Sequence, residues 1–355
     1  MSQGPAQVIK RTQWLVILVG FLLVLSPAVR AEVAISRIES NHQIVAAVNV
    51  RAGLADLPTG TVWAGLAVDL TKALAAAILE DGSKVKFVVG DRKTGPQKLQ
   101  QGEIDLYFPV EPMAPTKLTN SGLTASYPFF FSLQKIMVRK ESGFTSVPQL
   151  VHSPIAVQPG YVNEQNEEMA NEQHLRDYFQ RAGLPLMVFP FQEWDEMESA
   201  FTSGHVKAVS AEENELARLR AAHRAEVGDA VILPEIIAMA PVSAVVQAND
   251  PNWVVLINAT ISALIRAEEL GITSENLDAS KNSKDPEILY LLGGTRGVGS
   301  VVGLDDQWVE RVINAVGNYG QAFERDLGKS SGLSIDRSLN QDWRHGGLLY
   351  AMPIQ

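Results

Sequence analysis

The sequence contains no cysteine in its 355 residues. This absence excludes disulfide bonds, thiol nucleophiles, zinc sites with thiolate ligands and a lipid anchor on an N-terminal cysteine. The composition is 46% hydrophobic and 20% charged, with no low-complexity tract, which is typical of a folded protein. The fold therefore has to be stabilised by packing alone.

Signatures of metal sites, cofactors and catalysis are also scarce. Residues 293–299 and 328–330 lack the glycine spacing of a nucleotide-binding loop. The histidines are scattered without the spacing that metal ligands need: His42, His152, His174, His205, His223 and His345. We therefore expect no metal, no cofactor and no enzyme activity.

The N-terminus has the pattern of an export signal. Lys10 and Arg11 precede the apolar run 14–25, which is shorter than the roughly 20 residues that span a bilayer. Small residues follow up to Ala31, as a signal peptidase requires. We expect residues 1–31 to be removed after Ala31, with an uncleaved anchor as the alternative. No later segment resembles a membrane span.

The exported chain is strongly acidic. The full sequence has a formal net charge of -10, and loss of residues 1–31 removes three basic residues and no acidic one, which gives -13. Such a chain is a poor candidate for binding nucleic acid or anionic membranes. Life in a bacterial periplasm fits this composition better.

Strand-like and helix-like segments alternate in the first half of the exported chain. Residues 42–50 form a nearly continuous apolar run rich in valine, which is typical of a strand buried on both faces. Apolar residues recur at helical spacing over 69–78. A strand at 84–89, a short helix through Leu99 and a strand at 102–106 follow. This order predicts an α/β lobe with a largely parallel sheet.

A second round of the same alternation begins after an expected hinge at 138–142. It predicts strands at 155–157, 186–189, 205–209 and 230–233, with helices at 163–181, 193–203 and 212–224. The chain then returns through a strand at 244–246, a long amphipathic helix from Trp253 and a helical C-terminal extension. The expected division is a signal peptide at 1–31, a first lobe at 32–138, a second lobe at 139–236, and a return with an extension at 237–355.

Two lobes joined by two crossings would enclose a cleft. Open α/β sheets bind ligands beyond the carboxyl ends of their strands. The stretch 106–140 is central to this prediction, because it holds both a ligand-contacting loop and the first crossing. The loops expected to face the cleft are 51–56, 107–117, 158–164 and 210–214.

Eight short motifs occur in order along the exported chain: WAGLAVDL at 63–70, KVKF at 84–87, LQQGEID at 99–105, MVRK at 137–140, VILPEII at 231–237, AEELGITS at 267–274, GNYG at 317–320 and GGLLY at 346–350. Together they resemble the general L-amino-acid-binding proteins of ABC transporters, in solute-binding protein family 3. The resemblance implies a type II periplasmic-binding-protein fold of two lobes. Such a protein closes over an amino acid and delivers it to a membrane permease driven by an ATPase.

The resemblance also implies which residues contact the ligand. A first-lobe arginine of the family grips the ligand carboxylate, and Lys117 stands at that position here, with the charge but without the forked geometry. Arg51 lies nearby, where the family has no arginine. Glu212 matches the acid that meets the ligand's amino group, and Tyr161 ends the second-lobe turn that meets the carboxylate. The remaining candidates are carboxylates and a tyrosine on the predicted cleft loops: Asp56, Tyr107 and Glu111.

Several readings stay open at this stage. Lys117 could be a solvated loop lysine, Tyr161 could pack between helices, and Glu212 could be a helix N-terminal charge. The leading hypothesis is a monomeric periplasmic receptor of an ABC importer that binds an amino acid or a related small zwitterion. The alternatives are a ligand-binding module for a membrane sensor, a receptor for a different solute and, last, a lyase or dehydratase that uses Glu111 or Glu212 as a general acid.

Overall fold

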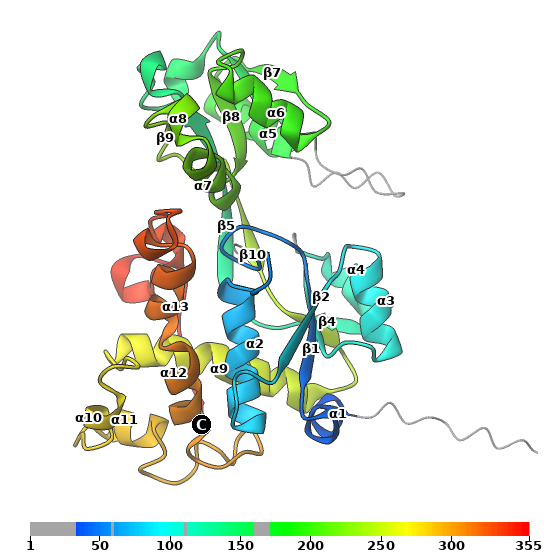
Figure 1. The fold of residues 1–355 in the computed structure, drawn as a ribbon, viewed down its shortest axis with the longest axis vertical. Helices are drawn as coiled ribbons and strands as arrows, with labels where there is room; N and C mark the ends of the chain where they lie inside the picture. Colours follow the sequence, from blue (N-terminus) through cyan, green and yellow to red (C-terminus); the bar gives the residue numbers. More distant parts are fainter. Residues whose placement is uncertain (1–32, 58–59, 110–111, 160–170, 355) are drawn as a thin grey trace, which may run out of the picture. The chain divides into compact units, whose positions relative to one another are not determined.

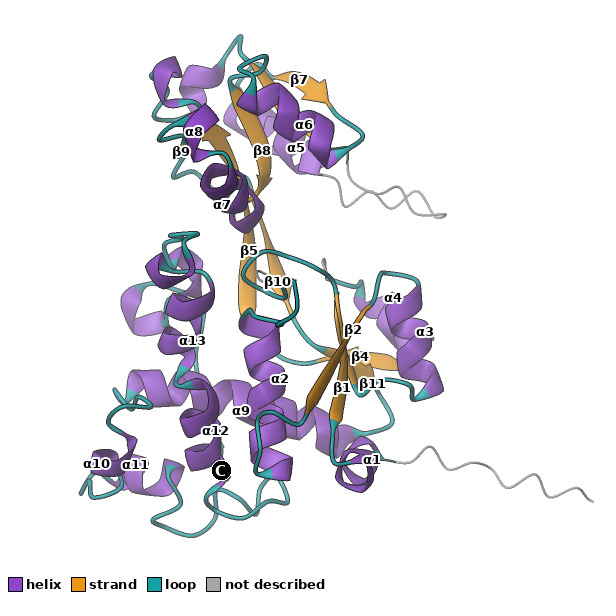
Figure 2. Cartoon of the chain, viewed as in Figure 1, coloured by secondary structure: helices purple, strands orange, loops and turns teal. Residues whose placement is uncertain are grey.

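Two β-sheets organise the chain, and helices lie against both (Figures 1 and 2). The computed structural model describes residues 33–57, 60–109, 112–159 and 171–354. The expected signal peptide lies outside these residues. Both sheets lie within one compact unit, Val33–Gln355. The α/β class predicted from the sequence is confirmed.

The first sheet has the strand order β2-β1-β3-β11-β4. β1 pairs in parallel with β2 and β3, whereas β11 is antiparallel to β3 and β4. The strands are β1 (Ile44–Val48), β2 (Val85–Val89), β3 (Leu106–Phe108), β4 (Leu123–Ala125) and β11 (Val245–Gln247). β11 belongs to the returning chain, so this sheet is assembled from two separated stretches of sequence.

Two buried helices fill the centre of the first lobe. α2 (Leu66–Leu79) is rich in alanine, and 11 of its residues are buried, so other helices can approach it closely. α9 (Pro251–Glu269) begins where the carboxylate of Asp250 accepts a hydrogen bond of 3.1 Å from the amide of Trp253. The other helices of this lobe are α1 (Ala34–Asn41), α3 (Thr94–Gln101) and α4 (Pro115–Asn120).

The second sheet has the order β10-β5-β8-β6-β7, and β9 also pairs with β5. β6 is parallel to β7 and β8, and β5 is antiparallel to β8, β9 and β10. The strands are β5 (Phe130–Val138), β6 (Pro154–Val157), β7 (Met187–Pro190), β8 (Ala208–Glu212), β9 (Val231–Ile232) and β10 (Ala238–Val242). The helices are α5 (Asn171–Ala182), α6 (Trp194–Thr202), α7 (Glu213–Ala222), α8 (Arg224–Val227), and the 3-10 turns η1 (Lys140–Ser142) and η2 (Val147–Leu150).

The strand β5 carries the first crossing. Its first half, from Phe130 to Gln134, pairs with β10, and its second half, from Gln134 to Val138, pairs with β8. Both partners belong to the second sheet, and the edge of β5 that faces β8 is paired only from Gln134 onward. The hinge expected at 138–142 stays a prediction. Apolar periodicity marks a strand but not the residue at which it changes partner.

A C-terminal extension of short helices packs on the first lobe. Its members are α10 (Leu277–Ser280), α11 (Pro286–Leu291), α12 (Trp308–Val316), α13 (Tyr319–Asp326), and the 3-10 turns η3 (Lys329–Ser331), η4 (Ser338–Asn340) and η5 (Trp343–His345). The buried side chains of Trp308 and Phe323 share one hydrophobic core with α2 and α9. This extension is therefore part of the first lobe's core.

Two buried carboxylates meet where α2 packs against α13. Asp69 and Asp326 are 5% and 7% exposed. The guanidinium of Arg325 donates to Asp69, and the ammonium of Lys72 lies 3.5 Å from the other oxygen of Asp69. Burial, followed by the negative charge of Asp69, raises the pKa of Asp326 to about 8.

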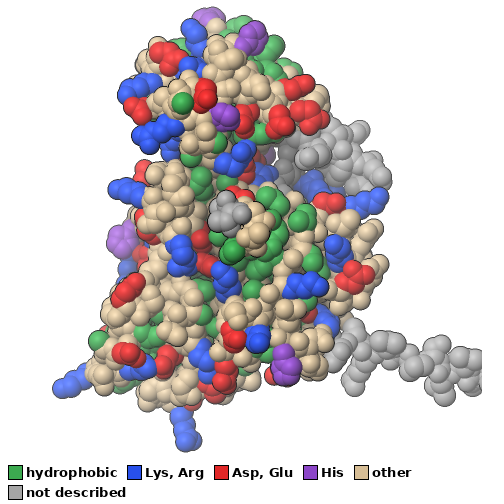
Figure 3. All heavy atoms as spheres, viewed as in Figure 1, with side chains coloured by type: hydrophobic (Ala, Val, Ile, Leu, Met, Phe, Trp, Pro, Cys, Tyr) green, Lys and Arg blue, Asp and Glu red, His purple; other side chains and the backbone are tan. Residues whose placement is uncertain are grey.

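The surface mixes charges of both signs. Acidic and basic side chains are interspersed over the face shown in Figure 3, and the net charge of -10 is not gathered there in one patch. None of the helices in the described part of the chain combines the length and the apolar character that crossing a membrane requires.

The carboxyl group of Asp326 should make stability depend on pH. Because its folded-state pKa of about 8 lies above the ordinary value of 3.8, its contribution is present below about pH 4 and is lost as the pH rises to about 8. Asp326→Asn cannot ionise. We compare the free energy of unfolding of Asp326→Asn with that of the unmodified protein at each pH. This difference should favour the variant by about 1–3 kcal/mol more at pH 8 than at pH 5.

Urea denaturation at the two pH values measures this difference. Asp195→Asn removes an exposed carboxylate at the start of α6 and serves as the control, with the same effect expected at both pH values. A change in Asp326→Asn that is equal at pH 5 and pH 8 would contradict a carboxyl group that is protonated in the folded protein.

Candidate functional site

An ion pair joins a loop of the first lobe to the second lobe. Arg51 follows β1 in the first sheet, and Glu212 ends β8 in the second. The Nη1 atom of Arg51 lies 3.3 Å from Oε2 of Glu212, and the two side chains are 20% and 17% exposed. Arg51 follows and Glu212 forms the carboxyl end of a strand with a parallel neighbour, and open α/β sheets bind ligands at that end.

The backbone around Arg51 forms a tight turn. The amide of Arg51 donates to the carbonyl of Ala55 over 2.8 Å, and the amide of Ala55 donates back over 3.0 Å. Gly53 has a φ of +70°, and a Cβ atom there would lie 2.3 Å from the side chain of Leu327 in the extension. Only glycine fits this position, so the extension supports the turn that presents Arg51.

The start of α7 holds the same turn from the other side. The side-chain amide of Asn214 donates to the carbonyl of Ala52 over 2.9 Å, and Glu215 accepts from the amide of Ala52 over 3.2 Å. The side chain of Ala217 is buried in the hydrophobic core of the first lobe. One helix of the second lobe thus fixes both backbone groups of Ala52, next to Arg51.

Glu212 is also tied to the crossing strand. The side chain of Asn171 donates to Glu212 over 3.4 Å. Gln134 in turn donates to the carbonyl of Asn171 over 2.7 Å and to the hydroxyl of Ser210 over 3.0 Å. His174 lies 3.2 Å from the amide oxygen of Gln134. This polar network links the acid of the site to β5.

A pocket opens beside Arg51 in the first lobe. Its cavity volume is about 10 Å³, roughly enough for one water molecule in this arrangement of the lobes, and two polar side chains, Asn49 and Arg51, line it. Its apolar walls come from Leu54, Ala55, Ala67, Phe108, Phe129 and Val242. Because Phe129 and Val242 lie at the two crossings, movement of the lobes would change this pocket.

A second ion pair lies close to Glu212 in the sequence. The ammonium of Lys135 on β5 is 2.8 Å from the carboxylate of Glu213, and their side chains are 9% and 12% exposed. Burial raises the pKa of Glu213, and Lys135 opposes that rise. Lys135 and Glu213 thus balance each other's charge one residue along the chain from Glu212.

The structure brings some of the predicted site residues together. Arg51 and Glu212 meet, as described. Lys117 lies on the short helix α4, where it is half-buried and has an interaction with another residue. The carboxylate of Asp56 accepts from the amide of Leu57 over 2.7 Å and so stabilises its own loop. Glu111 and Tyr161 lie outside the described residues.

Tyr107 lies in the core and is not brought to the ion pair. Its side chain is fully buried in a cluster with Leu99, Leu118 and Val245. A Cβ atom on Gly95 would lie 2.6 Å from the ring, so the helix α3 approaches Tyr107 as closely as glycine allows. Burial raises the pKa of Tyr107 to about 12. Alternation along β3 points Tyr107 to the opposite face from Phe108, which lines the pocket.

Three residues of the site were missed in the sequence. Asn49 lines the pocket, and Asn214 and Glu215 hold Ala52. Asn214 belongs to the loop 210–214 that was expected to face the cleft. The sequence pattern there predicts only a helix, and it does not indicate a contact of the Asn214 side chain with Ala52. Within the described residues, no group of three or more histidines and carboxylates could hold a metal ion.

Comparison with known proteins identifies the family. No family model matches the chain. The chain is 35% identical over 295 residues to the general L-amino acid-binding periplasmic protein AapJ of Rhizobium johnstonii. This match covers 82% of the present chain and 84% of AapJ. The chain belongs to the amino-acid-binding periplasmic proteins of ABC transporters. The family suggested by the eight sequence motifs is thereby confirmed.

Two further comparisons agree with this assignment. The binding protein is 33% identical over 304 residues to the glutamate/glutamine/aspartate/asparagine-binding protein BztA of Rhodobacter capsulatus, covering 85% of this chain and 87% of that one. A solved periplasmic binding protein of an ABC transporter from Brucella ovis, with glutathione bound, has a TM-score of 0.76 at 33% identity. That likeness covers 90% of this chain and 99% of the Brucella chain, and it confirms the type II periplasmic-binding-protein fold.

The contact between Asn214 and Ala52 should contribute measurably to stability. In Asn214→Ala the buried carbonyl of Ala52 loses its donor, so we expect the free energy of unfolding to fall by about 1–3 kcal/mol in urea denaturation. Asn282→Ala is the control, because Asn282 is exposed and donates to the carbonyl of Asp278 over 3.2 Å. Equal losses in the two variants would show that the buried contact contributes no more than a surface one.

Proposed function

We propose that this binding protein captures a small zwitterion in the periplasm and presents it to an ABC permease and its ATPase. The ligand is an amino acid or a peptide with a free amino and carboxyl group. The observation that supports this most directly is the Arg51–Glu212 pair, in which two lobes offer opposite charges beside an apolar pocket. The relatives agree, since AapJ and BztA are named for amino acids and the Brucella protein holds glutathione.

The chemistry of the pair suits a zwitterion. The planar guanidinium of Arg51 can donate two parallel hydrogen bonds to a carboxylate, and the carboxylate of Glu212 can accept from an ammonium group. A lone amine that took Glu212 would leave Arg51 unpaired, and a lone acid that took Arg51 would leave Glu212 unpaired. Only a ligand with both groups replaces the internal pair without an unpaired charge.

Lys117 is the second cation that we propose for the ligand's carboxylate. By the family resemblance it stands at the position of a ligand-gripping arginine, and a lysine supplies charge without the bidentate geometry. Arg51 would supply the fork that Lys117 lacks. The apolar walls of the pocket would then cover the uncharged part of the ligand, since Leu54, Phe108 and Phe129 offer it no polar group.

Several further statements belong to the same proposal. Residues 1–31 direct export and are cleaved after Ala31, the receptor acts as a monomer, and the ligand leaves unchanged. The lobes extend over residues 32–138 and 139–236, and the return and extension over 237–355. Mass spectrometry of the exported protein tests the cleavage site.

Calorimetric titration with a panel of amino acids, their decarboxylated amines, and glutathione tests the function. Glu212→Gln keeps the shape of the side chain but not its charge. A charge-assisted hydrogen bond contributes about 1.5–3 kcal/mol, so we expect a tenfold to hundredfold weaker affinity for the preferred zwitterion. Arg51→Met should reduce the preference for an amino acid over the matching amine by at least about tenfold.

Two exposed residues provide matched controls. Glu103→Gln, just before β3, and Arg296→Met, in the extension, remove the same charges away from the ion pair. Both should leave the affinities unchanged. A receptor that binds no compound of the panel with measurable heat would contradict the proposed ligand class. Unchanged affinity in Glu212→Gln would remove Glu212 from the site.

A further inference from the structure

One edge of the crossing strand β5 lacks a neighbouring strand at its start. β10 pairs with residues Phe130 to Gln134 on one side, whereas on the other side β8 begins only at Gln134. Phe131 stands opposite Pro241, which has no N–H to donate. The backbone groups of Phe131 therefore belong to a pair without mutual hydrogen bonds and point to the open edge.

The side chain of Asn340 occupies that open edge. Its Oδ1 atom accepts from the amide of Phe131 over 2.7 Å, and its Nδ2 atom donates to the carbonyl of Phe131 over 2.9 Å. Asn340 is 3% exposed. A side-chain amide carries a donor and an acceptor side by side, so Asn340 replaces the strand that is missing beside Phe131.

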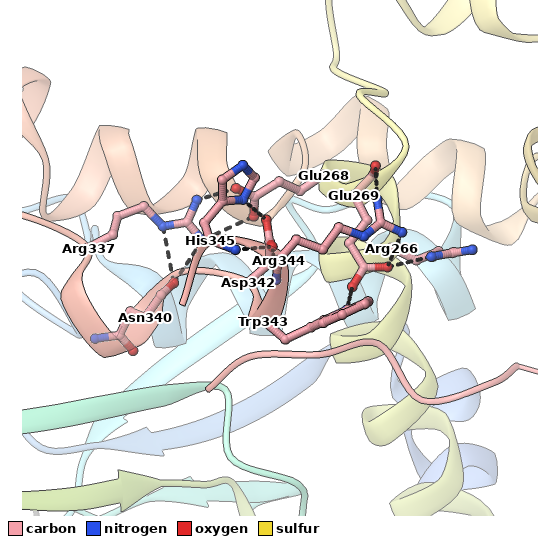
Figure 4. Close-up of polar contacts among 9 residues, drawn as sticks. All are labelled: Arg266, Glu268, Glu269, Arg337, Asn340, Asp342, Trp343, Arg344 and His345. Atoms are coloured by element: carbon pink, nitrogen blue, oxygen red, sulfur yellow. Dashed lines mark hydrogen bonds and ion pairs between the residues drawn. The ribbon is translucent and has the colours of Figure 1, made fainter. Parts of the chain in front are cut away.

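Arg337 and its partners hold Asn340 in place (Figure 4). Arg337 donates to the carbonyl of Asn340 over 2.8 and 3.1 Å. Its guanidinium forms a bidentate pair with Glu268 near the end of α9. It also lies over the rings of Tyr319 and Phe323, 5.3 and 5.4 Å from their centroids. Asn340 is therefore fixed to the central helix of the first lobe.

A second contact from the extension reaches Phe129, directly before the start of β5. The hydroxyl of Tyr319 donates to the carbonyl of Phe129 over 2.8 Å, and this hydroxyl is buried. Tyr319 belongs to the hydrophobic core that α2 and α9 share. Phe129 and Phe131 are thus both anchored by the extension, and from Gln134 onward β8 pairs with β5. The backbone between these points is the part left to bend.

We propose that Asn340 is a positioning residue for the hinge, which anchors β5 at Phe131 and confines lobe movement to residues 132–134. Its role in ligand capture rests on the proposed function, because closure matters only if a ligand is enclosed. A fixed pivot reduces the number of lobe arrangements in the empty protein. It thereby lowers the entropy that closure costs.

Asn340→Ala removes both hydrogen bonds to Phe131, and Asn340→Asp keeps the acceptor but not the donor. Asn318→Ala is the matched control. Asn318 is 5% exposed, accepts from the amide of Gln321 over 2.9 Å and donates to the carbonyl of Ile272 over 2.7 Å. The control therefore loses the same kind and number of buried contacts without touching the crossing strand.

The first readout is hydrogen exchange without ligand. In Asn340→Ala the amide of Phe131 should exchange at least about tenfold faster relative to the amide of Val48 in β1, and in Asn340→Asp the increase should be smaller. In Asn318→Ala the ratio of the two exchange rates should stay unchanged. Comparison with Val48 removes any effect of general stability on both amides.

The second readout is the distance between the lobes. Because the chain has no cysteine, Gln97→Cys in α3 and Gln180→Cys in α5 give two unique sites for spin labels on exposed helix positions. Asn340→Ala should broaden the distance distribution of the empty protein and weaken binding of the preferred panel compound by about threefold to tenfold. Asn318→Ala should do neither.

Distributions and exchange ratios that are the same in Asn340→Ala and Asn318→Ala would overturn the proposal and leave Asn340 as a stabilising residue only. If Asn340→Ala fails to fold, Asn340→Asp carries the same comparison. Exchange and distances are measured without ligand, so they decide the role of Asn340 even if no panel compound binds. Failure of the proposed function is thereby distinguished from failure of this inference.

Discussion

The hydrogen bonds of β5 are the constraint on which the rest of this structure depends. A buried backbone needs partners for every N–H and C=O, and the two edges of this strand find them over different residues. β10 serves one edge over Phe130 to Gln134, and β8 serves the other edge from Gln134 onward. The gap before Gln134 is filled by a side chain, Asn340, which comes from the C-terminal extension.

The C-terminal extension stabilises the first lobe and the start of β5 by packing, in a chain that has no cysteine to form a disulfide cross-link. Leu327 fills the space that a side chain on Gly53 would need, Tyr319 holds Phe129, and Arg337 connects α9 to Asn340. These contacts are hydrogen bonds, ion pairs and van der Waals contacts. A disulfide across the crossing would fix the lobes relative to each other. These contacts hold only the start of β5 and leave residues 132–134 able to bend.

The sequence was informative where the signal was local. Apolar runs predicted the parallel strands and the loops beyond their ends, and the family resemblance singled out Arg51 and Glu212 on those loops. The hinge expected at 138–142 stays a prediction, and the change of pairing partner at Gln134 lies inside one continuous strand, where no sequence pattern marks it. Asn340 and Phe131 are 209 residues apart, so no pattern in either segment indicates their contact. Tyr107 was expected at the cleft, but the pleat of β3 turns it into the core.

In the proposed function, the Arg51–Glu212 pair would account for ligand selectivity at a site where the sequence resemblance puts Lys117 in the position of the family's arginine. In the structure the charges of Arg51 and Glu212 satisfy each other before a ligand arrives. A ligand that replaces this ion pair has to provide a charged partner for both Arg51 and Glu212. A ligand with a single charge would leave one of them unpaired in a poorly solvating pocket. A zwitterion exchanges one internal pair for two external ones. Selectivity then follows from charge balance between the lobes as much as from the geometry of any one side chain.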